Sequence, residues 1–347
     1  MLKLDNISKS YGGFSLQDIS LKINRGEYFV LLGRSGSGKS QLLEVISGLR
    51  RADSGNIVLN DIDITTQKIQ TRPVGFVFQD FALFPHLSVF DNIAFPLRML
   101  KTSREEIESK VNKIAFEINI ERILDRKPEM LSGGEKQRVA VARTLVRSPK
   151  IILLDEPMAS IDTPLRDDIR RLLRRINRGG ITILHVTHDY KEAIRLADRV
   201  GVIHQGRIIQ IGKPEEVFNN PVNRFVARFA GIQNFFKIKI DIEKDTQMAT
   251  GRNGFRFLLP PGEYPQDAIA MLHSDKIVLS TEQADNEFNS TIGEIIEINR
   301  AEHGYEAYIK AEETFYVTFS EQLLSDLGLE TGMMIGLSFK EDALKVI

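Results

Sequence analysis

Short apolar runs alternate with segments of helical periodicity along the first 235 residues. Four of these runs are almost continuously apolar, which is typical of strands covered on both faces: 28–32, 74–78, 151–154 and 181–186. Strands that alternate with helices in this way form a parallel sheet in an α/β fold. Residues 1–7 and 14–23 differ, because apolar and polar residues alternate in them, and they predict an antiparallel sheet beside the main core.

Helical periodicity replaces the strand pattern between residues 81 and 130. Ser103 and Glu106 have the spacing of a capping box, in which each side chain accepts a hydrogen bond from the other residue's backbone N–H. They predict a helix over 103–118. We therefore expect a helical subdomain, over about residues 81–145, inserted into the α/β core.

After residue 235 the chain consists of short β-rich runs separated by Gly, Pro, Asn and Asp. The runs are 236–243, 255–260, 268–273, 276–280, 291–296, 306–311, 315–319 and 334–339. Close spacing of this kind predicts small β-barrels. The expected fold is an α/β domain over 1–235 followed by an all-β domain over 236–347, with a weaker break near 282–290.

The charge balance gives no indication of a nucleic-acid partner. Lys and Arg number 46 against 47 Asp and Glu, a net charge of -1, whereas duplex-binding proteins usually carry a basic surplus. The sequence has no Cys, which excludes disulfides and cysteine nucleophiles and fits a reducing compartment. It opens without the layout of a secretion signal, and no apolar run approaches the roughly 20 residues that span a bilayer. We expect a soluble protein that reaches a membrane only through a partner.

Residues 33–40, GRSGSGKS, match the phosphate-binding loop G-x-x-x-x-G-K-[ST] and lie between a predicted strand and a predicted helix. Gly36 and Gly38 let the backbone curl so that its N–H groups face a phosphate, and the helix adds its positive N-terminal end. Lys39 is expected to contact the β- and γ-phosphates, and Ser40 to offer a hydroxyl to Mg²⁺. The loop alone does not separate ATP from GTP. The expected nucleotide contacts of this segment are Gly33, Arg34, Ser35, Gly36, Ser37, Gly38, Lys39, Ser40 and Gln41.

A second nucleotide element is the apolar run that ends in two acids, IILLDEP. We expect Asp155 to hold Mg²⁺ through water and Glu156 to polarise the attacking water. By itself the same sequence would also fit a strand that ends in a surface turn.

The segment LSGGEKQR, residues 131–138, starts a helix. Ser132 and Glu135 form a second capping box, but Gly133 and Gly134 are poor helix formers. Two glycines at a helix N-terminus are explained if a phosphate must approach the exposed N–H groups.

With these motifs in this order, the first 235 residues resemble the ATPases of the ATP-binding cassette (ABC) family. In that family LSGGEKQR contacts the γ-phosphate of ATP held by the opposite subunit. The resemblance therefore implies a head-to-tail homodimer with ATP and Mg²⁺ at two shared sites. It implies four further roles: adenine stacking by Tyr11, contact with metal and water by Gln79, coupling of the two sites by Asp162, and contact with the γ-phosphate and Glu156 by His188. Gln41 and Arg34 replace a common threonine and proline, and neither change removes a reacting group. We interpret His185 as a core residue.

The helical insert and the C-terminal region resemble those of importer ATPases. Phe81 and Phe84, next to Gln79, are candidates for a groove that receives a short helix of a membrane permease, or for ordinary core packing. Residues 290–347 resemble the TOBE/MOP-type barrel, which in molybdate and tungstate importers can bind the transported oxyanion. The resemblance implies an ATP-hydrolysing subunit on the cytoplasmic face of the cell membrane. Its partners would be permease subunits and, indirectly, a solute-binding protein.

Two alternatives stay open at this point. The cargo could be sulfate, iron, a sugar or a polyamine instead of molybdate or tungstate. The chain could also resemble a soluble ABC ATPase that acts on nucleic acid or ribosomes, although such proteins often carry two cassettes or a long coiled-coil insertion, and this sequence has neither.

Overall fold

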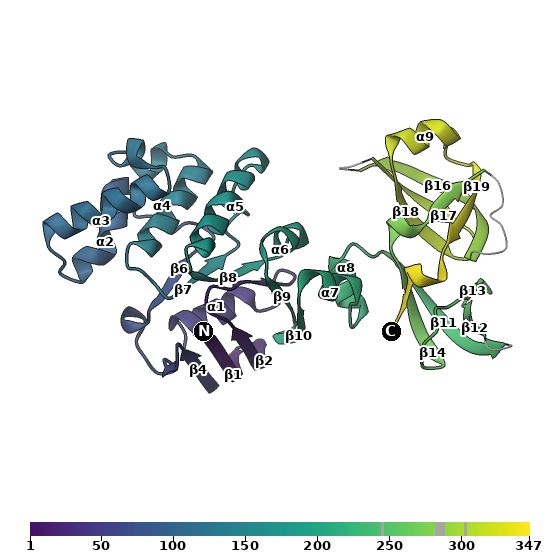
Figure 1. Cartoon of the computed structure of the whole chain (residues 1–347), viewed down its shortest axis with the longest axis horizontal. Coiled ribbons are helices and arrows are strands. Elements are labelled where there is room, and N and C mark those ends of the chain that lie inside the picture. Colours follow the sequence, from purple (N-terminus) through teal and green to yellow (C-terminus); the bar gives the residue numbers. More distant parts are fainter. Residues whose placement is uncertain (244–245, 282–288, 302–303) are drawn as a thin grey trace. The chain divides into compact units, whose positions relative to one another are not determined.

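The structure, a computed structural model, describes residues 1–243, 246–281, 289–301 and 304–347. The chain forms two compact units, Met1–Val217 and Phe218–Ile347 (Figure 1). The border lies earlier than the predicted 235/236, and helix α8 (Arg224–Phe229) belongs to the second unit. The guanidinium carbon of its Arg224 lies 4.6 Å from the centroid of the Phe235 ring, and the Ala230 carbonyl that follows the helix is 3.0 Å from Nε2 of His273.

A six-stranded sheet forms the centre of the first unit, in the order β10-β9-β3-β8-β7-β6. Its strands are β3 (Tyr28–Leu32), β6 (Val74–Val77), β7 (Ile151–Asp155), β8 (Thr182–Thr187), β9 (Arg199–His204) and β10 (Arg207–Gly212). Every neighbouring pair is parallel except β9 and β10. The predicted parallel sheet is confirmed, and the strands β3, β7 and β8 are buried along their whole length.

An antiparallel sheet lies beside this core, in the order β2-β1-β4-β5. Its strands are β1 (Leu2–Tyr11), β2 (Phe14–Ile23), β4 (Ser54–Leu59) and β5 (Ile62–Asp63). The apolar residues of β1 and β2 pack with helix α1 (Lys39–Ser47) and with β3 in one cluster. The alternating pattern of residues 1–23 thus predicted β1 and β2 of this sheet, whereas β4 and β5 were not predicted.

The expected helical insert is present. Helices α2 (Val89–Met99), α3 (Arg104–Glu117) and α4 (Gly133–Leu145) lie together, apart from the sheet of β1, β2 and β4 (Figure 1). Ser103 caps α3 by accepting a hydrogen bond from the Glu106 N–H at 3.3 Å. The Glu106 carboxylate pairs with Lys110 at 2.7 Å, so the predicted box is formed in one direction.

The remaining helices of the first part of the chain follow the strands of the central sheet. They are α5 (Thr163–Arg178), α6 (Tyr190–Leu196) and α7 (Pro214–Asn219), with short 3-10 turns at Ile69–Thr71, Glu121–Ile123 and Pro128–Met130. Within the described residues, no helix is long and apolar enough to cross a bilayer.

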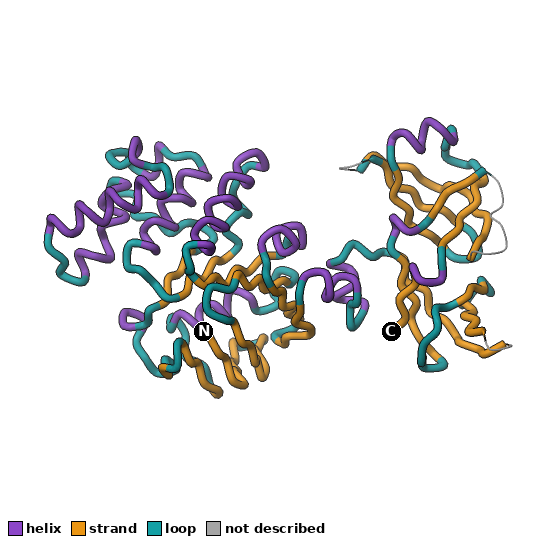
Figure 2. Tube along the Cα trace, in the orientation of Figure 1, coloured by secondary structure: helices purple, strands orange, loops and turns teal. Residues whose placement is uncertain are grey.

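Two five-stranded sheets form the framework of the second unit (Figure 2). One sheet has the order β13-β12-β11-β14-β20 and the other β15-β19-β16-β17-β18. The bounds are β11 (Asn234–Glu243), β12 (Thr246–Gly251), β13 (Arg256–Leu258), β14 (Asp267–Leu272), β15 (Val278–Ser280), β16 (Asn289–Arg300), β17 (Tyr305–Lys310), β18 (Thr314–Phe319), β19 (Met334–Phe339) and β20 (Leu344–Val346). Helix α9 (Glu321–Leu327) and the turns Ser274–Lys276 and Glu341–Ala343 complete the unit.

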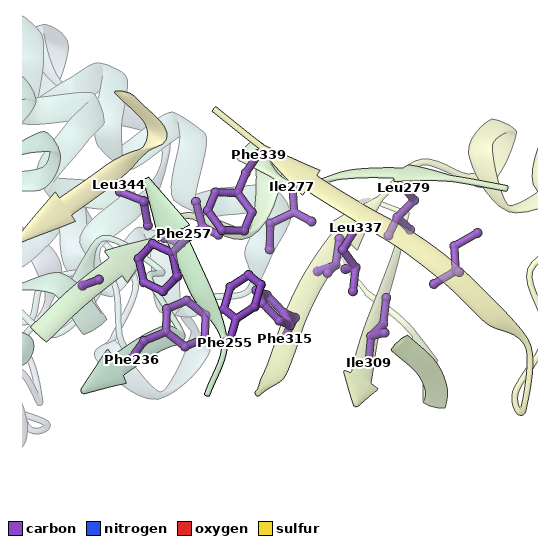
Figure 3. Packing of buried hydrophobic residues seen from close by; sticks show 14 of the residues in the cluster. Phe236, Phe255, Phe257, Ile277, Leu279, Ile309, Phe315, Leu337, Phe339 and Leu344 are labelled. Carbon is purple, nitrogen blue, oxygen red and sulfur yellow. The ribbon is translucent and has the colours of Figure 1, made fainter. Parts of the chain in front are cut away.

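The two sheets are not successive barrels. Strand β15, which precedes the expected break, pairs with β19, and the last strand, β20, returns to pair with β14. Residues 282–288, where most of that break would fall, lie outside the described residues. Phe236 and Phe257 from one sheet and Phe315 and Phe339 from the other pack in a single core (Figure 3). Residues 290–347 therefore share one hydrophobic core with residues 234–280, and each of the two sheets contains strands from both segments.

Candidate nucleotide-binding site

The predicted catalytic residues follow strands at the carboxyl edge of the central sheet. Parallel register places the ends of β3, β8 and β7 side by side. Residues 33–40 follow β3, Asp155 ends β7, and His188 comes directly after β8. Ligands of open α/β sheets bind at this edge. The sheet therefore brings motifs that are far apart in the sequence into one site.

Two glycines of the 33–40 loop have backbone angles that side chains rarely allow. Gly36 has φ of 77° and Gly38 has φ of 105°, and Gly38 directly precedes the first residue of α1. A Cβ at Gly38 would lie 2.7 Å from the Phe14 ring, and one at Gly33 would lie 2.7 Å from the Ile203 carbonyl oxygen. The loop is therefore built to bring its N–H groups, and the N-terminus of α1, close to an anion.

Lys39 is buried at the base of this loop. Its Nζ donates hydrogen bonds to the carbonyls of Gly33 at 2.8 Å and Arg34 at 3.2 Å, and lies 3.5 Å from Oε1 of Glu156. Burial lowers the pKa of Lys39, and the nearby Glu156 opposes that shift. The ammonium is thus held in place and faces the Glu156 carboxylate, which follows β7, on the far side of β8 from β3.

The loop also borders a cavity of about 560 Å³, but neither Lys39 nor Ser40 lines it. Its lining includes Phe14 and the loop segment from Arg34 to Ser37. The Ser37 hydroxyl is buried and has no hydrogen-bond partner among the described residues. An unpaired buried hydroxyl is costly. The cavity does not coincide with the predicted contacts of the β- and γ-phosphates at Lys39.

Ser40 and Asp155 meet as a pair of oxygen donors. The Ser40 hydroxyl donates to Oδ1 of Asp155 at 2.9 Å. Burial raises the pKa of Asp155, although the bond from Ser40 counteracts this shift. A cation would favour the charged carboxylate here. Among the described residues, no group of three or more His, Asp or Glu side chains is placed to hold a metal ion, so the candidate donors here are Ser40 and Asp155. That donor set fits Mg²⁺, which commonly takes one or two protein oxygens together with phosphates and water.

Glu156 lies between Lys39 and His188. Its Oε2 is 2.9 Å from Nδ1 of His188, and its side chain is 13% exposed. The residue has φ of 43°, an uncommon angle for a residue other than glycine, and its N–H donates to the Val186 carbonyl of β8 at 3.0 Å. The backbone of β8 thus fixes the carboxylate at the sheet edge, where it can accept a proton or orient water.

The LSGGEKQR segment forms its predicted capping box. The Glu135 N–H donates to the Ser132 hydroxyl at 3.3 Å, and the Ser132 N–H donates to the Glu135 carboxylate at 2.8 Å. A Cβ at Gly133 would lie 2.9 Å from the Ser160 carbonyl oxygen, whereas one at Gly134 would make an ordinary contact with Leu165. Packing within the chain therefore explains Gly133, which sequence reasoning attributed to phosphate access.

The other predicted residues take different places. Gln79 is exposed just beyond β6, and Asp162 is the exposed N-cap residue of α5 without a side-chain capping bond. The Tyr11 hydroxyl donates to the Gln41 carbonyl at 3.2 Å, and burial raises the pKa of Tyr11 to about 12. Tyr11 is not one of the residues that line the loop cavity, whereas Phe14 is. Sequence reasoning did not single out Phe14, although it is an aromatic residue three positions after Tyr11.

His185 belongs to a buried polar network that the sequence did not reveal. It is fully buried, as expected of a core residue, and its ring lies 3.1 Å from the Tyr28 hydroxyl and 3.2 Å from the Glu192 carboxylate. This network joins β3, β8 and α6 beneath the strand end that carries His188.

Comparison with known proteins connects this site to a transport family. Residues 16–159 match the family model described as ABC transporter. The molybdate/tungstate import ATP-binding protein WtpC of Pyrococcus abyssi is 41% identical over 357 aligned positions, which cover 100% of each chain. The spermidine/putrescine import ATP-binding protein PotA of Thermotoga maritima is 38% identical over 329 positions, 92% of this chain and 89% of that protein. The ATP-binding cassette MJ0796, solved as a dimer in a post-hydrolysis state bound to ADP and Pi, superposes with a TM-score of 0.56 at 33% identity, covering 62% of this chain and 99% of that one.

Proposed function

Because the chain belongs to the ATP-hydrolysing subunits of ABC transporters, we propose that it powers the import of molybdate or tungstate through a membrane permease. The observation that carries this proposal is the 41% identity to a molybdate/tungstate import protein over the whole of both chains, the C-terminal unit included. The activity itself, ATP hydrolysis, is that of the family.

The contacts of Glu156 support a role in activating water. Its carboxylate lies next to the imidazole of His188 and the ammonium of Lys39, at 2.9 and 3.5 Å. In the proposed reaction Glu156 orients the attacking water, Lys39 neutralises charge on the β- and γ-phosphates, and His188 contacts the γ-phosphate. The expected adenine contact is Tyr11, and Phe14 is a second aromatic candidate because its ring lies over Gly38.

Mg²⁺ is the metal that this donor set would hold. Ser40 and Asp155 are 2.9 Å apart, and Gln79 follows the strand next to the one that ends at Asp155. When bound, the ion would supply positive charge to balance the phosphates. The chain's own part is to hold two or three hard oxygen donors at the sheet edge.

A second copy of the chain would complete the site. Ser132 and Gly134 stand at the N-terminus of α4, a helix end that favours an anion. We propose that they close over the γ-phosphate of ATP bound to Lys39 of the other copy, with Asp162 linking the two sites. Support comes from the related cassette that was solved as a dimer.

The permease would bind the chain beside Gln79, at the cytoplasmic face of the membrane. Phe81 and Phe84 are partly buried there, and the rings of Phe84 and Phe95 lie 4.5 Å apart. Met99, at the end of helix α2 that also carries Phe95, is 69% exposed. Apolar side chains at this point are suited to a short amphipathic helix.

Import of a polyamine is the second candidate cargo, because PotA of Thermotoga maritima is 38% identical over most of both chains. The solute that stimulates ATP hydrolysis distinguishes a polyamine cargo from molybdate or tungstate. The full-length chain is reconstituted in liposomes with its permease and solute-binding protein, and either molybdate, tungstate, spermidine or sulfate is supplied. We expect molybdate and tungstate to raise the rate of hydrolysis. Stimulation by spermidine alone would transfer the assignment to polyamines.

Oxyanion binding by the C-terminal unit is a separate part of this proposal. Its support is the likeness of residues 290–347 to an oxyanion-binding barrel. Titration calorimetry of the full-length chain with molybdate tests it, with sulfate as the comparison anion. If molybdate gives no more heat than sulfate, the C-terminal oxyanion site is excluded while the transport assignment stands.

A further inference from the structure

The loop after Gln79 has a strained backbone. Phe81 has φ of 65° and Ala82 has φ of 45°, so two consecutive residues other than glycine adopt the left-handed conformation. For a bulky residue such as Phe81 this conformation is a genuine outlier, and it persists only where the surroundings hold it. The hydrogen bond from the Phe81 N–H to the Phe78 carbonyl, at 3.1 Å, forms the turn.

Arg143 of helix α4 forms hydrogen bonds with this strained segment. One nitrogen of its guanidinium donates to the Phe81 carbonyl at 2.8 Å and the other to the Ala82 carbonyl at 2.6 Å. The same group lies 5.5 Å from the centroid of the Phe84 ring. Both strained residues are therefore bonded to one planar side chain.

The charged guanidinium of Arg143 donates its hydrogen bonds to backbone carbonyls. No ion pair between Arg143 and a carboxylate occurs in the described part of the chain. Burial lowers the pKa of Arg143, and Asp80 opposes that shift. The geometry needs a planar fork with two parallel donors, which a lysine ammonium does not provide.

Arg143 connects two parts of the molecule with different roles. It stands in the last turn of α4, and Ser132 caps the first turn of the same helix. The next residue, Thr144, donates to the Phe76 carbonyl of β6 at 3.2 Å, so the helix end is also fixed to the strand that leads to Gln79. The segment that Arg143 bonds to runs from Gln79 to Phe84, where the permease is proposed to bind.

We propose that Arg143 is a positioning residue that latches the Phe81–Ala82 loop to α4, so that closure of Ser132 over ATP is transmitted to the permease-binding loop. This inference rests on the proposed function for its role in transport. The latch itself is a property of the chain alone. When α4 shifts at its Ser132 end, the carbonyls of Phe81 and Ala82 shift together with Arg143. If the guanidinium is lost, the strained backbone of these two residues relaxes.

Hydrogen exchange tests the latch without a permease. In the full-length Glu156→Gln chain, addition of ATP is expected to change amide exchange over residues 79–86. Arg143→Lys is expected to abolish that response and to raise exchange in this segment without ATP. Arg147→Lys is the matched control, since Arg147 lies one turn later and donates to the exposed Gln70 carbonyl. An ATP response that survives in Arg143→Lys overturns the proposal.

A second-site change separates a latch from general damage to the fold. Glycine adopts a φ of 45° without strain, so Ala82→Gly should hold the loop without the fork. In the reconstituted transporter, Arg143→Lys is expected to lower the ratio of permease-stimulated to basal hydrolysis by about fivefold or more. Adding Ala82→Gly is expected to restore part of that ratio. If the double variant is no better than Arg143→Lys, the strain argument is wrong. If the wild-type complex shows no stimulation with any solute, the transport assignment fails, and the exchange experiment still decides the latch.

Discussion

Nδ1 of His188 lies 2.9 Å from Oε2 of Glu156, although the two residues are 32 positions apart in the chain. The parallel pairing of β7 and β8 accounts for this contact, because Asp155 is in register with Val186 and both strands end at the same edge. The imidazole and the Lys39 ammonium therefore contact the Glu156 carboxylate from two neighbouring strand ends. The carboxylate that would orient water is thus held by contacts within the chain.

Replacing Glu156 by Gln tests this arrangement. The amide keeps the shape and the contact with His188 but cannot accept a proton, so we expect turnover to fall by about 100-fold or more while ATP is still bound. ATP should also hold the variant as a dimer, as measured by size-exclusion chromatography. Glu108→Gln, an exposed change on α3, is the control. Wild-type hydrolysis by Glu156→Gln would contradict the assignment of Glu156.

The sequence predicted those parts of the site whose chemistry lies within a few consecutive residues. The loop from Gly33 to Ser40 and the pair Asp155 and Glu156 follow buried strands, and parallel strands bring their ends together by rule. The apolar pattern also predicted β3, β6, β7 and β8 of the central sheet and the helical insert, but it did not predict β9 and β10.

Contacts between distant segments were not predictable in this way. The Phe14 ring over Gly38, the Ser160 carbonyl against Gly133 and the fork of Arg143 depend on tertiary packing that no local pattern encodes. In the second unit the pairing of β15 with β19 and of β14 with β20 crosses the expected break. Strands β12 and β20 were missed because one is polar and the other is three residues long.

Asp155 should limit the stability of the metal-free chain at neutral pH. Burial raises its pKa, so the folded chain binds this proton more tightly than the unfolded chain does. Its contribution to stability therefore falls as pH rises from the ordinary value of 3.8 through the folded pKa. We expect Asp155→Asn to raise the thermal midpoint at pH 7 in EDTA and to abolish Mg²⁺-dependent hydrolysis. Near pH 3 the two midpoints should converge, and a lower midpoint for Asp155→Asn at pH 7 would refute this account.

Arg72 should be essential for the helix that carries the phosphate loop. It is 2% exposed, and its guanidinium donates to the carbonyls of Val45 and Ile46 at the end of α1 and to those of Thr65 and Gln67. Arg72→Leu would leave these buried carbonyls without donors, and we expect it to lower the free energy of unfolding by about 2–4 kcal/mol. Urea denaturation measures the loss. Arg50→Leu, an exposed change near the same helix end, should alter stability by less than about 0.5 kcal/mol.

The two neighbouring glycines Gly133 and Gly134 should respond differently to the same substitution. A Cβ at Gly133 would lie 2.9 Å from the Ser160 backbone oxygen, so Gly133→Ala should destabilise the isolated chain by about 1–3 kcal/mol. At Gly134 the nearest atom would be the flexible Leu165 side chain at 3.5 Å, and the residue is in the first turn of a helix. Gly134→Ala should therefore leave stability unchanged or raise it by up to about 1 kcal/mol. If Gly134 also lets a phosphate approach in the dimer, Gly134→Ala will reduce ATP hydrolysis although the fold is intact. Thermal unfolding and steady-state hydrolysis of both variants separate packing within the chain from contact between copies. Equal stability losses in the two variants would show that the Ser160 carbonyl is not what requires a glycine at position 133.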